Sequence, residues 1–325
     1  MKTRKITILL TLVTLLFTGC SSVSNNPLTR TTTLFDTVIT IHIYDKDSDS
    51  ILDNCIEKCE EYEKKFSRTL EGSEIYQLNH AGGKAVELSE DTIELIQLGL
   101  KYSELSKGRF DITIAPLAAL WDFKNNTGTL PSEESISQAV SLIGYQNVHV
   151  EGNTVQLLTP NAAIDLGGIA KGYIADQLKA YMEDQGINHA LIDLGGNVLA
   201  VGSKPDGSAF NIGIQKPFAA TGEAITSVKI KDKAVVTSGN YQRYFQLDGK
   251  IYHHILDPKT GYPYDNDLQS VTVVCDSSSD ADGLSTTLFA MGLSEGLEYV
   301  ENLPSVEAVF ITKDGSLHYS SNFPK

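Results

Sequence analysis

The spacing of strands and helices is the feature of this sequence that most restricts its fold. From about Val148, short alternating apolar segments broken by glycine and asparagine follow one another, and only two further long helices are predicted, near 169–185 and 280–291. A doubly wound nucleotide-binding fold needs a helix after nearly every strand. We therefore expect an α+β architecture, mixed α/β with largely antiparallel strands, and not a Rossmann fold.

The part of the chain before Val148 supports the same architecture. Alternation over 37–44 predicts a first strand, followed by a charged amphipathic helix to about Lys65 and a second helix over 91–106. Cys55 and Cys59 lie four residues apart on the apolar stripe of the first helix, which favours core packing. A metal or redox pair is the alternative, but no histidine or third cysteine supports it.

The N-terminus has the pattern of an export signal. Basic residues precede an apolar run over 6–17 that ends at Thr18-Gly19-Cys20. The run is shorter than the roughly 20 residues that span a bilayer. Small residues before a cysteine resemble the bacterial lipobox, in which cleavage leaves Cys20 as a lipidated N-terminus; an ordinary cleaved signal with an incidental cysteine is the alternative. We expect a signal peptide at 1–19, a polar tether at 20–32 and one large domain at 33–325.

Charge and cysteine content limit the partners and the location. The formal net charge is −15, which excludes nucleic-acid binding through a basic surface. Of the four cysteines, three follow Cys20, and an odd number does not form a disulfide framework. We expect small molecules and proteins as partners, and a location at the cell membrane, lipid-anchored and facing the extracytoplasmic side.

A glycine-rich corner over 165–172 carries the strongest local signal. Gly167 and Gly168 allow backbone N–H groups to approach a phosphate, and the helix that follows adds its positive end. Lys171 supplies a charge for a pyrophosphate, and Asp165 can accept from a sugar or a base. The segment matches neither a Walker loop nor G-x-G-x-x-G. An anion site and a plain tight turn both remain open on this pattern.

A polar segment that enters a helix carries a second signal. Asp282 and Thr286 lie four residues apart, so a carboxylate and a hydroxyl share one helix face and can reach one hard cation. Two oxygen ligands leave room for water and phosphate oxygens, as Mg²⁺ prefers. The alternative is an N-cap acid and a threonine that serve only the helix backbone.

A histidine pair at a strand end is the third candidate. His254 precedes the rigid turn over 257–263, where an imidazole can act as a general base near neutral pH. A structural pair of histidines is the alternative.

Together these segments resemble the FAD:protein FMN transferases, the ApbE family. The resemblance runs in order from about Thr33 to the C-terminus. It rests on eight segments: 34–37, 66–68, 72–79, 108–113, 165–173, 238–241, 254–261 and 282–286. Each segment alone is a weak match, but all eight in this order are specific for the family. The fold implied is ApbE-like.

The resemblance implies a role for each matching residue. Asp282 and Thr286 would be side-chain ligands of Mg²⁺, joined by the backbone carbonyl of Gly168, and His254 would deprotonate the acceptor hydroxyl. The residues implied to hold FAD are Phe35, Arg68, Thr69, Arg109, Phe110, Asp111, Asp165, Lys171 and the backbone near Leu256. The family often has a tyrosine where this chain has Thr69, and methionine and glycine where it has Phe35-Asp36. The contact at Phe35 is therefore expected from the backbone.

The activity implied is Mg²⁺-dependent transfer of FMN from FAD to a threonine or serine hydroxyl of another protein. A phosphoester bond forms and AMP is released. The acceptors implied are membrane or exported redox proteins on the same side. Two alternatives share part of the pattern: an Mg²⁺-dependent pyrophosphatase that splits FAD into FMN and AMP, and a non-catalytic flavin-binding lipoprotein.

The lipobox interpretation predicts the behaviour of a Cys20→Ala variant. The variant should leave the membrane fraction but keep its catalytic activity in vitro, because only the lipid would hold the domain at the membrane. Fractionation of cells followed by immunoblotting measures this. A variant that still sediments with membranes would contradict the interpretation.

Overall fold

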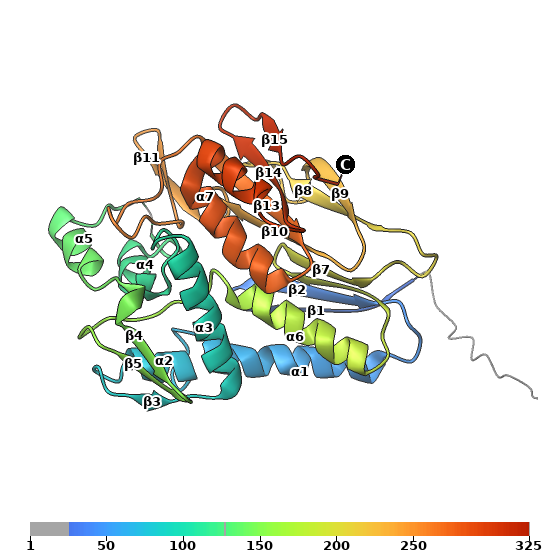
Figure 1. Ribbon diagram of the computed structural model, residues 1–325, viewed down its shortest axis with the longest axis horizontal. Coiled ribbons are helices and arrows are strands. Elements are labelled where there is room, and N and C mark those ends of the chain that lie inside the picture. The colour runs from blue at the N-terminus through green and yellow to red at the C-terminus, as the bar shows by residue number, and fades with distance from the viewer. Residues whose placement is uncertain (1–25, 127, 325) are drawn as a thin grey trace, which may run out of the picture.

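A large antiparallel sheet forms the centre of the molecule (Figure 1). The computed structural model describes residues 26–126 and 128–324. The sheet has the order β1-β2-β6-β7-β10-β13-β14-β15, and every neighbouring pair is antiparallel. Its strands are β1 (Leu28–Leu34), β2 (Thr37–Ile43), β6 (His189–Leu194), β7 (Asn197–Gly202), β10 (Ala234–Gly239), β13 (Leu268–Cys275), β14 (Glu307–Thr312) and β15 (Leu317–Tyr319). The predicted α+β architecture is confirmed.

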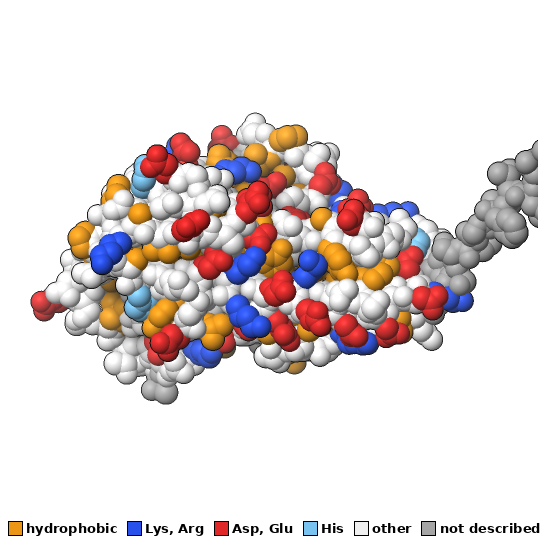
Figure 2. Space-filling model, turned by 90° about the horizontal axis from the view of Figure 1, so that it is seen from below, with side chains coloured by type: hydrophobic (Ala, Val, Ile, Leu, Met, Phe, Trp, Pro, Cys, Tyr) orange, Lys and Arg blue, Asp and Glu red, His pale blue; other side chains and the backbone are white. Residues whose placement is uncertain are grey.

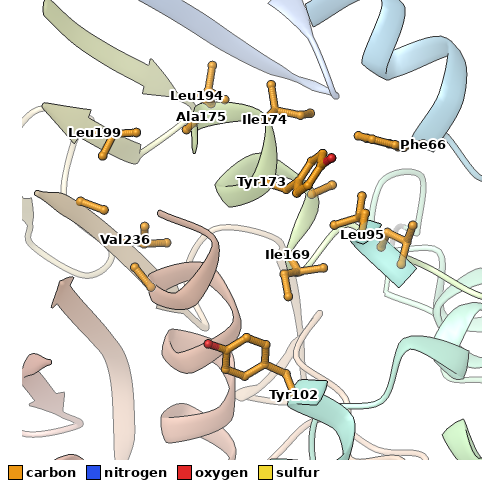
Figure 3. Close-up of a cluster of buried hydrophobic side chains, with 14 of the residues drawn as sticks. Phe66, Leu95, Tyr102, Ile169, Tyr173, Ile174, Ala175, Leu194, Leu199 and Val236 are labelled. Atoms are coloured by element: carbon orange, nitrogen blue, oxygen red, sulfur yellow. The ribbon is translucent and has the colours of Figure 1, made fainter. Parts of the chain in front are cut away.

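Helices cover one face of the sheet, and the main core lies between these helices and the sheet. The long helices are α1 (Asp49–Phe66), α3 (Glu90–Leu105), α6 (Ala170–Asp184) and α7 (Ser278–Glu301). Helices α6 and α7 lie side by side against the sheet (Figure 1). Tyr173, Ile174 and Ala175 of α6 point into a cluster that also contains Leu194 and Val236 of the sheet (Figure 3). Removing this apolar surface from water stabilises the layer by about 25 cal/mol per Å².

Strand β2 shows how the sheet divides the molecule. Ile39, Ile41 and Ile43 are fully buried in the core, while Val38, Thr40 and His42 alternate with them and face the other side. The predicted strand over 37–44 is confirmed. Cys55 and Cys59 of α1 are buried free thiols in the same core, and burial raises the pKa of both to about 12. The prediction that they serve packing is confirmed.

The second face of the sheet is covered by a hairpin of β8 (Phe210–Gln215) and β9 (Ala224–Ile230). Phe210 and Ile214 of this hairpin pack with Val235 and Val309 of the sheet in a second core cluster.

A smaller part of the molecule, at the left of Figure 1, lies beside the sheet. It contains α2 (Glu74–Asn79), α4 (Ala115–Trp121), α5 (Glu133–Val140), β3 (Val86–Glu87), β4 (Val148–Glu151), β5 (Thr154–Leu157), β11 (Tyr244–Leu247), β12 (Lys250–His253), and the 3-10 helices Ile112–Ile114 and Tyr145–Asn147. Trp121 is fully buried at the centre of its own apolar cluster, with Phe245 and Leu256.

Two element boundaries differ from the predicted ones. Strand β1 begins at Leu28 and pairs with β2, so it takes up residues 28–32 of the predicted tether. Helix α7 continues to Glu301, beyond the predicted end at 291, after a break at Gly292 with φ of 79°. The predicted end thus coincides with a real interruption of the helix. The predicted signal peptide and Cys20 lie outside the described residues.

Charged side chains of both signs cover the face of the molecule shown in Figure 2. On the face shown in Figure 2, lysine and arginine side chains are interspersed with acidic ones and form no continuous basic stripe. Within residues 26–126 and 128–324, none of the helices has the length and apolar character to cross a bilayer.

Helices α6 and α7 are joined by an aspartate that caps one helix from the other. Asp176 of α6 accepts hydrogen bonds from the backbone N–H groups of Ser278 (2.8 Å) and Ser279 (2.9 Å), and from the hydroxyls of Ser277 (2.9 Å) and Ser279 (2.6 Å). The first N–H groups of a helix have no partner within it, and a negative charge there is favourable. This contact fixes the N-terminus of α7 against α6.

Asp176→Asn should therefore destabilise the fold by roughly 2 to 3 kcal/mol, because hydrogen bonds to a charged acceptor contribute more than neutral ones and the amide N–H₂ faces donors. Urea unfolding followed by circular dichroism measures this. Asp184→Asn, at an exposed position of the same helix, is the matched control and should change stability by less than about 0.5 kcal/mol. Equal stability of the two variants would contradict the capping role.

Candidate functional site

A cleft of about 1540 Å³ opens between the sheet, the N-terminal ends of α6 and α7, and the part that contains α4. This is larger than the roughly 300–1,000 Å³ of a typical small-molecule pocket. Every predicted site residue in the described part of the chain lines it: Phe35, Arg68, Thr69, Arg109, Phe110, Asp111, Asp165, Gly168, Lys171, His254, Leu256, Asp282 and Thr286. Segments far apart in the sequence therefore meet in one place.

Asp282 lies where α6 and α7 approach most closely. Its side chain is buried, and Oδ2 accepts a hydrogen bond from the backbone N–H of Gly172 at 2.9 Å. Lys171 Nζ lies 3.7 Å from the same oxygen. Burial raises the pKa of Asp282, and the positive charge of Lys171 opposes this shift. Both contacts are made by Oδ2.

Gly172 is required for this approach. A Cβ added at Gly172 would lie 2.4 Å from the carbonyl oxygen of Ser278 and 2.8 Å from Cβ of Asp282. Any larger residue would push the two helices apart and move the carboxylate.

Asp282 does not cap its own helix, α7, but accepts from the first turn of α6. The N-cap of α7 is Ser277, whose side chain accepts from the N–H of Asp280, and Asp176 satisfies the next N–H groups. Asp282 lies beyond the cap and bonds to another helix. Thr286, one turn further and half-buried, has its hydroxyl 2.9 Å from that of Ser238 on β10. Thr286 thus joins α7 to the sheet within the cleft.

The glycine corner forms the adjoining wall. Asp165 Oδ1 accepts from the N–H of Gly167 at 2.8 Å, and Oδ2 pairs with Arg68 Nε at 2.8 Å. Phe110 packs so closely on Gly168 that a Cβ there would lie 2.9 Å from its ring. Lys171 follows in the first turn of α6. The corner therefore brings two cationic side chains and a helix N-terminus to the same cleft.

Two of the predicted FAD contacts are engaged with the protein itself. Arg109 makes a bidentate ion pair with Glu295 at 2.5 and 2.9 Å, which leaves it part-exposed at the cleft. Asp111 is buried and accepts from the N–H and hydroxyl of Thr113 (2.8 and 2.6 Å) and from the N–H of Tyr145 (3.0 Å). Burial raises the pKa of Asp111, and these hydrogen bonds oppose the shift. The carboxylate of Asp111 thus orders the loop that carries Arg109 and Phe110.

Phe35, Thr69 and Leu256 form the rest of the predicted contact surface. Phe35 has a left-handed backbone with φ of 56°, and its N–H donates to Glu63 Oε1 at 2.7 Å. The N–H of Thr69 donates to Ser67 Oγ at 3.3 Å, and Leu256 pairs with Pro263 across the turn. The backbone N–H of Phe35 is therefore already in use, and the half-buried residue both lines the cleft and packs against the main core.

The two adjacent histidines have different environments. His253 is buried with Nε2 at 3.0 Å from the carbonyl oxygen of Tyr264 and serves the structure, whereas half-buried His254 lines the cleft. Nδ1 of His254 is buried and has no hydrogen-bond partner among the described residues. Burial, and next the nearby charge of Arg243, lower the pKa of His254 to about 3. The ring is therefore neutral near pH 7 and, in these surroundings, a weak base.

Two polar residues of the site had no role assigned from the sequence. Ser238 bonds to Thr286, and Asn197 of β7 accepts from Ser278 Oγ at 2.6 Å and lies beside Asp282. Ser238 belongs to the segment 238–241 that carries the resemblance, which was a usable signal. Asn197 follows an ordinary hairpin, and only the three-dimensional contact identifies it.

The donor atoms fit Mg²⁺. A carboxylate, a hydroxyl and a nearby backbone carbonyl are hard oxygen ligands, and Mg²⁺ usually takes one or two carboxylates with phosphate oxygens and water. Residues 26–126 and 128–324 contain no cluster of three or more histidine, cysteine, aspartate or glutamate side chains suited to a metal ion. A cation here would therefore rely on the substrate for further ligands.

Comparisons with known proteins agree on one family. A sequence model described as the ApbE family matches residues 35–310. An FAD:protein FMN transferase of Klebsiella pneumoniae is 36% identical over 291 residues, covering 89% of this chain and 90% of that protein. Another from Vibrio cholerae is 33% identical over 267 residues, covering 81% of this chain and 80% of that protein.

Solved structures give the same result. The ApbE protein of Thermotoga maritima superposes with a TM-score of 0.85 at 31% identity, covering 92% of this chain and all of that one (100%). The flavin transferase ApbE of Vibrio cholerae superposes with a TM-score of 0.81 at 29% identity, covering 93% and 99%.

Proposed function

This chain belongs to the ApbE family, and we propose that it transfers FMN from FAD to a serine or threonine hydroxyl of another protein with the help of Mg²⁺. The names of its relatives support flavin transfer. The observation that carries the Mg²⁺ part is the buried Asp282 carboxylate held beside Lys171 and one helical turn from Thr286.

The cation would be held by Asp282, Thr286 and the carbonyl oxygen of Gly168. When bound there, Mg²⁺ supplies positive charge to the pyrophosphate oxygens and orients them. Lys171 adds a second positive charge at the same place, where negative charge grows on the departing phosphate. Arg68 and Arg109 also line the cleft and are suited to the rest of FAD.

The reaction is a phosphoryl transfer in which atoms balance without a further reactant. The acceptor hydroxyl oxygen bonds to the phosphorus on the FMN side, and the bond from that phosphorus to the bridging oxygen breaks. AMP leaves with the bridging oxygen, and the hydroxyl proton goes to His254. Because the resting pKa of His254 is about 3, the ring is a weak base alone. The negative charge of bound pyrophosphate raises that pKa, which couples proton removal to FAD binding.

The enzyme would act at the cell membrane, anchored through a lipid on Cys20 and facing the extracytoplasmic side. The apolar leader and the Thr18-Gly19-Cys20 sequence support this location. The acceptors would then be membrane or exported redox proteins on that side.

Mass spectrometry of an acceptor tests the proposed reaction. Proteins from cells that lack the gene are incubated with the enzyme, FAD and Mg²⁺. The expected result is a serine or threonine peptide heavier by one FMN, with one AMP released per label. AMP and free FMN without a labelled peptide would identify a pyrophosphatase instead. No AMP at all would identify a flavin-binding protein.

Asp282→Ala should reduce transfer by several powers of ten, because the loss of several kcal/mol of charge stabilisation changes the rate by that much. Thr286→Ala should lose less and recover partly at raised Mg²⁺, because water can replace a neutral oxygen ligand. The measurement is the transfer rate against Mg²⁺ concentration, with circular dichroism as a check of folding. A folded Asp282→Ala variant with full rate and unchanged Mg²⁺ saturation would contradict the assignment.

His254→Gln should slow transfer by about 10²–10⁴-fold, the usual contribution of a general base, and change the Kd for FAD by less than about twofold. Stopped-flow transfer rates and flavin fluorescence titration measure the two quantities. His149→Gln, exposed on β4, is the control. An equal loss in rate and FAD affinity would make His254 a binding residue, and an unchanged rate would make it structural.

A further inference from the structure

The hairpin β8–β9 forms one wall of the cleft, and only β8 borders it. Asn211, Ile212, Gly213 and Gln215 of β8 line the cleft, whereas no residue of β9 does. In the described structure β8 pairs only with β9. The outer edge of β8 therefore faces the cleft.

The backbone groups on this edge can be assigned from the strand pairing. Lys216 donates its N–H to the carbonyl oxygen of Glu223 at 2.8 Å, so Lys216 turns toward β9. The irregularity between Ile214 and Gln215 adds its extra residue on β9, because Gln215 pairs with Ala224 and Ile214 with Thr226. The backbone N–H and C=O groups of β8 therefore alternate between its two edges without interruption.

Every second residue of a strand turns its N–H and C=O groups to the same edge. Because Lys216 turns toward β9, Ile214 and Ile212 do so as well. Asn211, Gly213 and Gln215 turn theirs toward the cleft. Across the described residues these outward groups have no backbone hydrogen bond to another element. An unpaired strand edge of this kind is a template for one more strand.

The floor beside this edge is the second face of the main sheet. Val38, Thr40 and His42 of β2 and Leu191 and Asp193 of β6 line the cleft there, and Val38 is 58% exposed. We call the space the β8 trough and define it by Val38, Thr40, His42, Leu191, Asp193, Asn211, Gly213 and Gln215.

The β8 trough is continuous with the proposed reaction centre. Strand β7, next to β6, begins with Asn197, which lies beside Asp282. Strand β10, next to β7, carries Ser238, which bonds to Thr286 at 2.9 Å. None of the residues predicted to hold FAD belongs to the trough. The cleft therefore has room for a second substrate that approaches from this side.

We propose that the acceptor polypeptide binds in the β8 trough as an added β-strand, with its backbone hydrogen-bonded to Asn211, Gly213 and Gln215. The extended segment leads its hydroxyl residue toward Asp282 and His254. This inference rests on the proposed transfer to protein. Backbone pairing supplies affinity with little dependence on side chains, so the same edge can accept different proteins.

Asn211→Pro tests the pairing, because proline removes one N–H from the cleft edge and leaves the bonds between β8 and β9 in place. Lys229→Pro is the matched control: Lys229 pairs with Asn211 in register and is exposed, and its N–H points away from the cleft on the outer edge of β9. Asn211→Ala removes the side chain alone. Val38→Arg fills the trough from an exposed position on β2.

The acceptor is unlabelled total protein from cells that lack the gene, diluted in series, and covalent flavin is read by in-gel fluorescence. Asn211→Pro should raise the half-saturating acceptor concentration by about tenfold, the equivalent of one hydrogen bond of about 1.4 kcal/mol. Val38→Arg should raise the half-saturating acceptor concentration by at least as much. Asn211→Ala should raise this concentration less than Asn211→Pro does, whereas Lys229→Pro and the FAD affinity of all four variants should match the wild type.

Unchanged half-saturation in both Asn211→Pro and Val38→Arg would overturn the proposal. Weakened FAD binding in Val38→Arg would also overturn it, because the trough would then hold FAD. If wild-type enzyme releases AMP but labels no protein, the proposed transfer fails, and this outcome is distinct from a failure of the trough.

Discussion

The hydrogen bond from the backbone N–H of Gly172 to the carboxylate of Asp282 is the contact on which the site depends. It exists because α6 and α7 approach so closely that no side chain fits at Gly172. On α6, Gly172 directly follows Lys171 and the glycine corner. On α7, Asp282 lies one helical turn before Thr286. A single helix–helix contact therefore sets the distance between the proposed anion-binding and cation-binding halves of the site.

Three cationic side chains at the cleft are already paired with carboxylates of the protein. Arg68 pairs with Asp165, Arg109 with Glu295, and Lys171 lies near Asp282. Such pairs keep long side chains oriented toward the cleft before a substrate arrives. A phosphate or a cation must compete with them, so binding exchanges one set of ion pairs for another and leaves the wall in place. Preorganised charges of this kind stabilise developing charge in a transition state.

The sequence predicted the architecture and which residues line the site better than it predicted what each residue contacts. Helical and strand periodicity are local, so α1, α3, α6 and β2 were predicted within one or two residues. The segments 164–168 and 192–196 share the same five residues, yet Gly195 and Gly196 have positive φ in a hairpin and Gly167 and Gly168 lead into a helix. The pairing of Arg109 with Glu295, 186 residues away, has no local signal. Contacts of this kind depend on how the elements pack.

The most direct test of the account is to locate the metal. Crystals soaked with FAD and Mn²⁺ in place of Mg²⁺ would give an anomalous difference peak at the cation. A peak is expected about 2.2 Å from the Asp282 carboxylate and the Thr286 hydroxyl, near the usual Mg²⁺–oxygen distance. A peak away from Asp282, or no peak at a Mn²⁺ concentration that supports transfer, would contradict it.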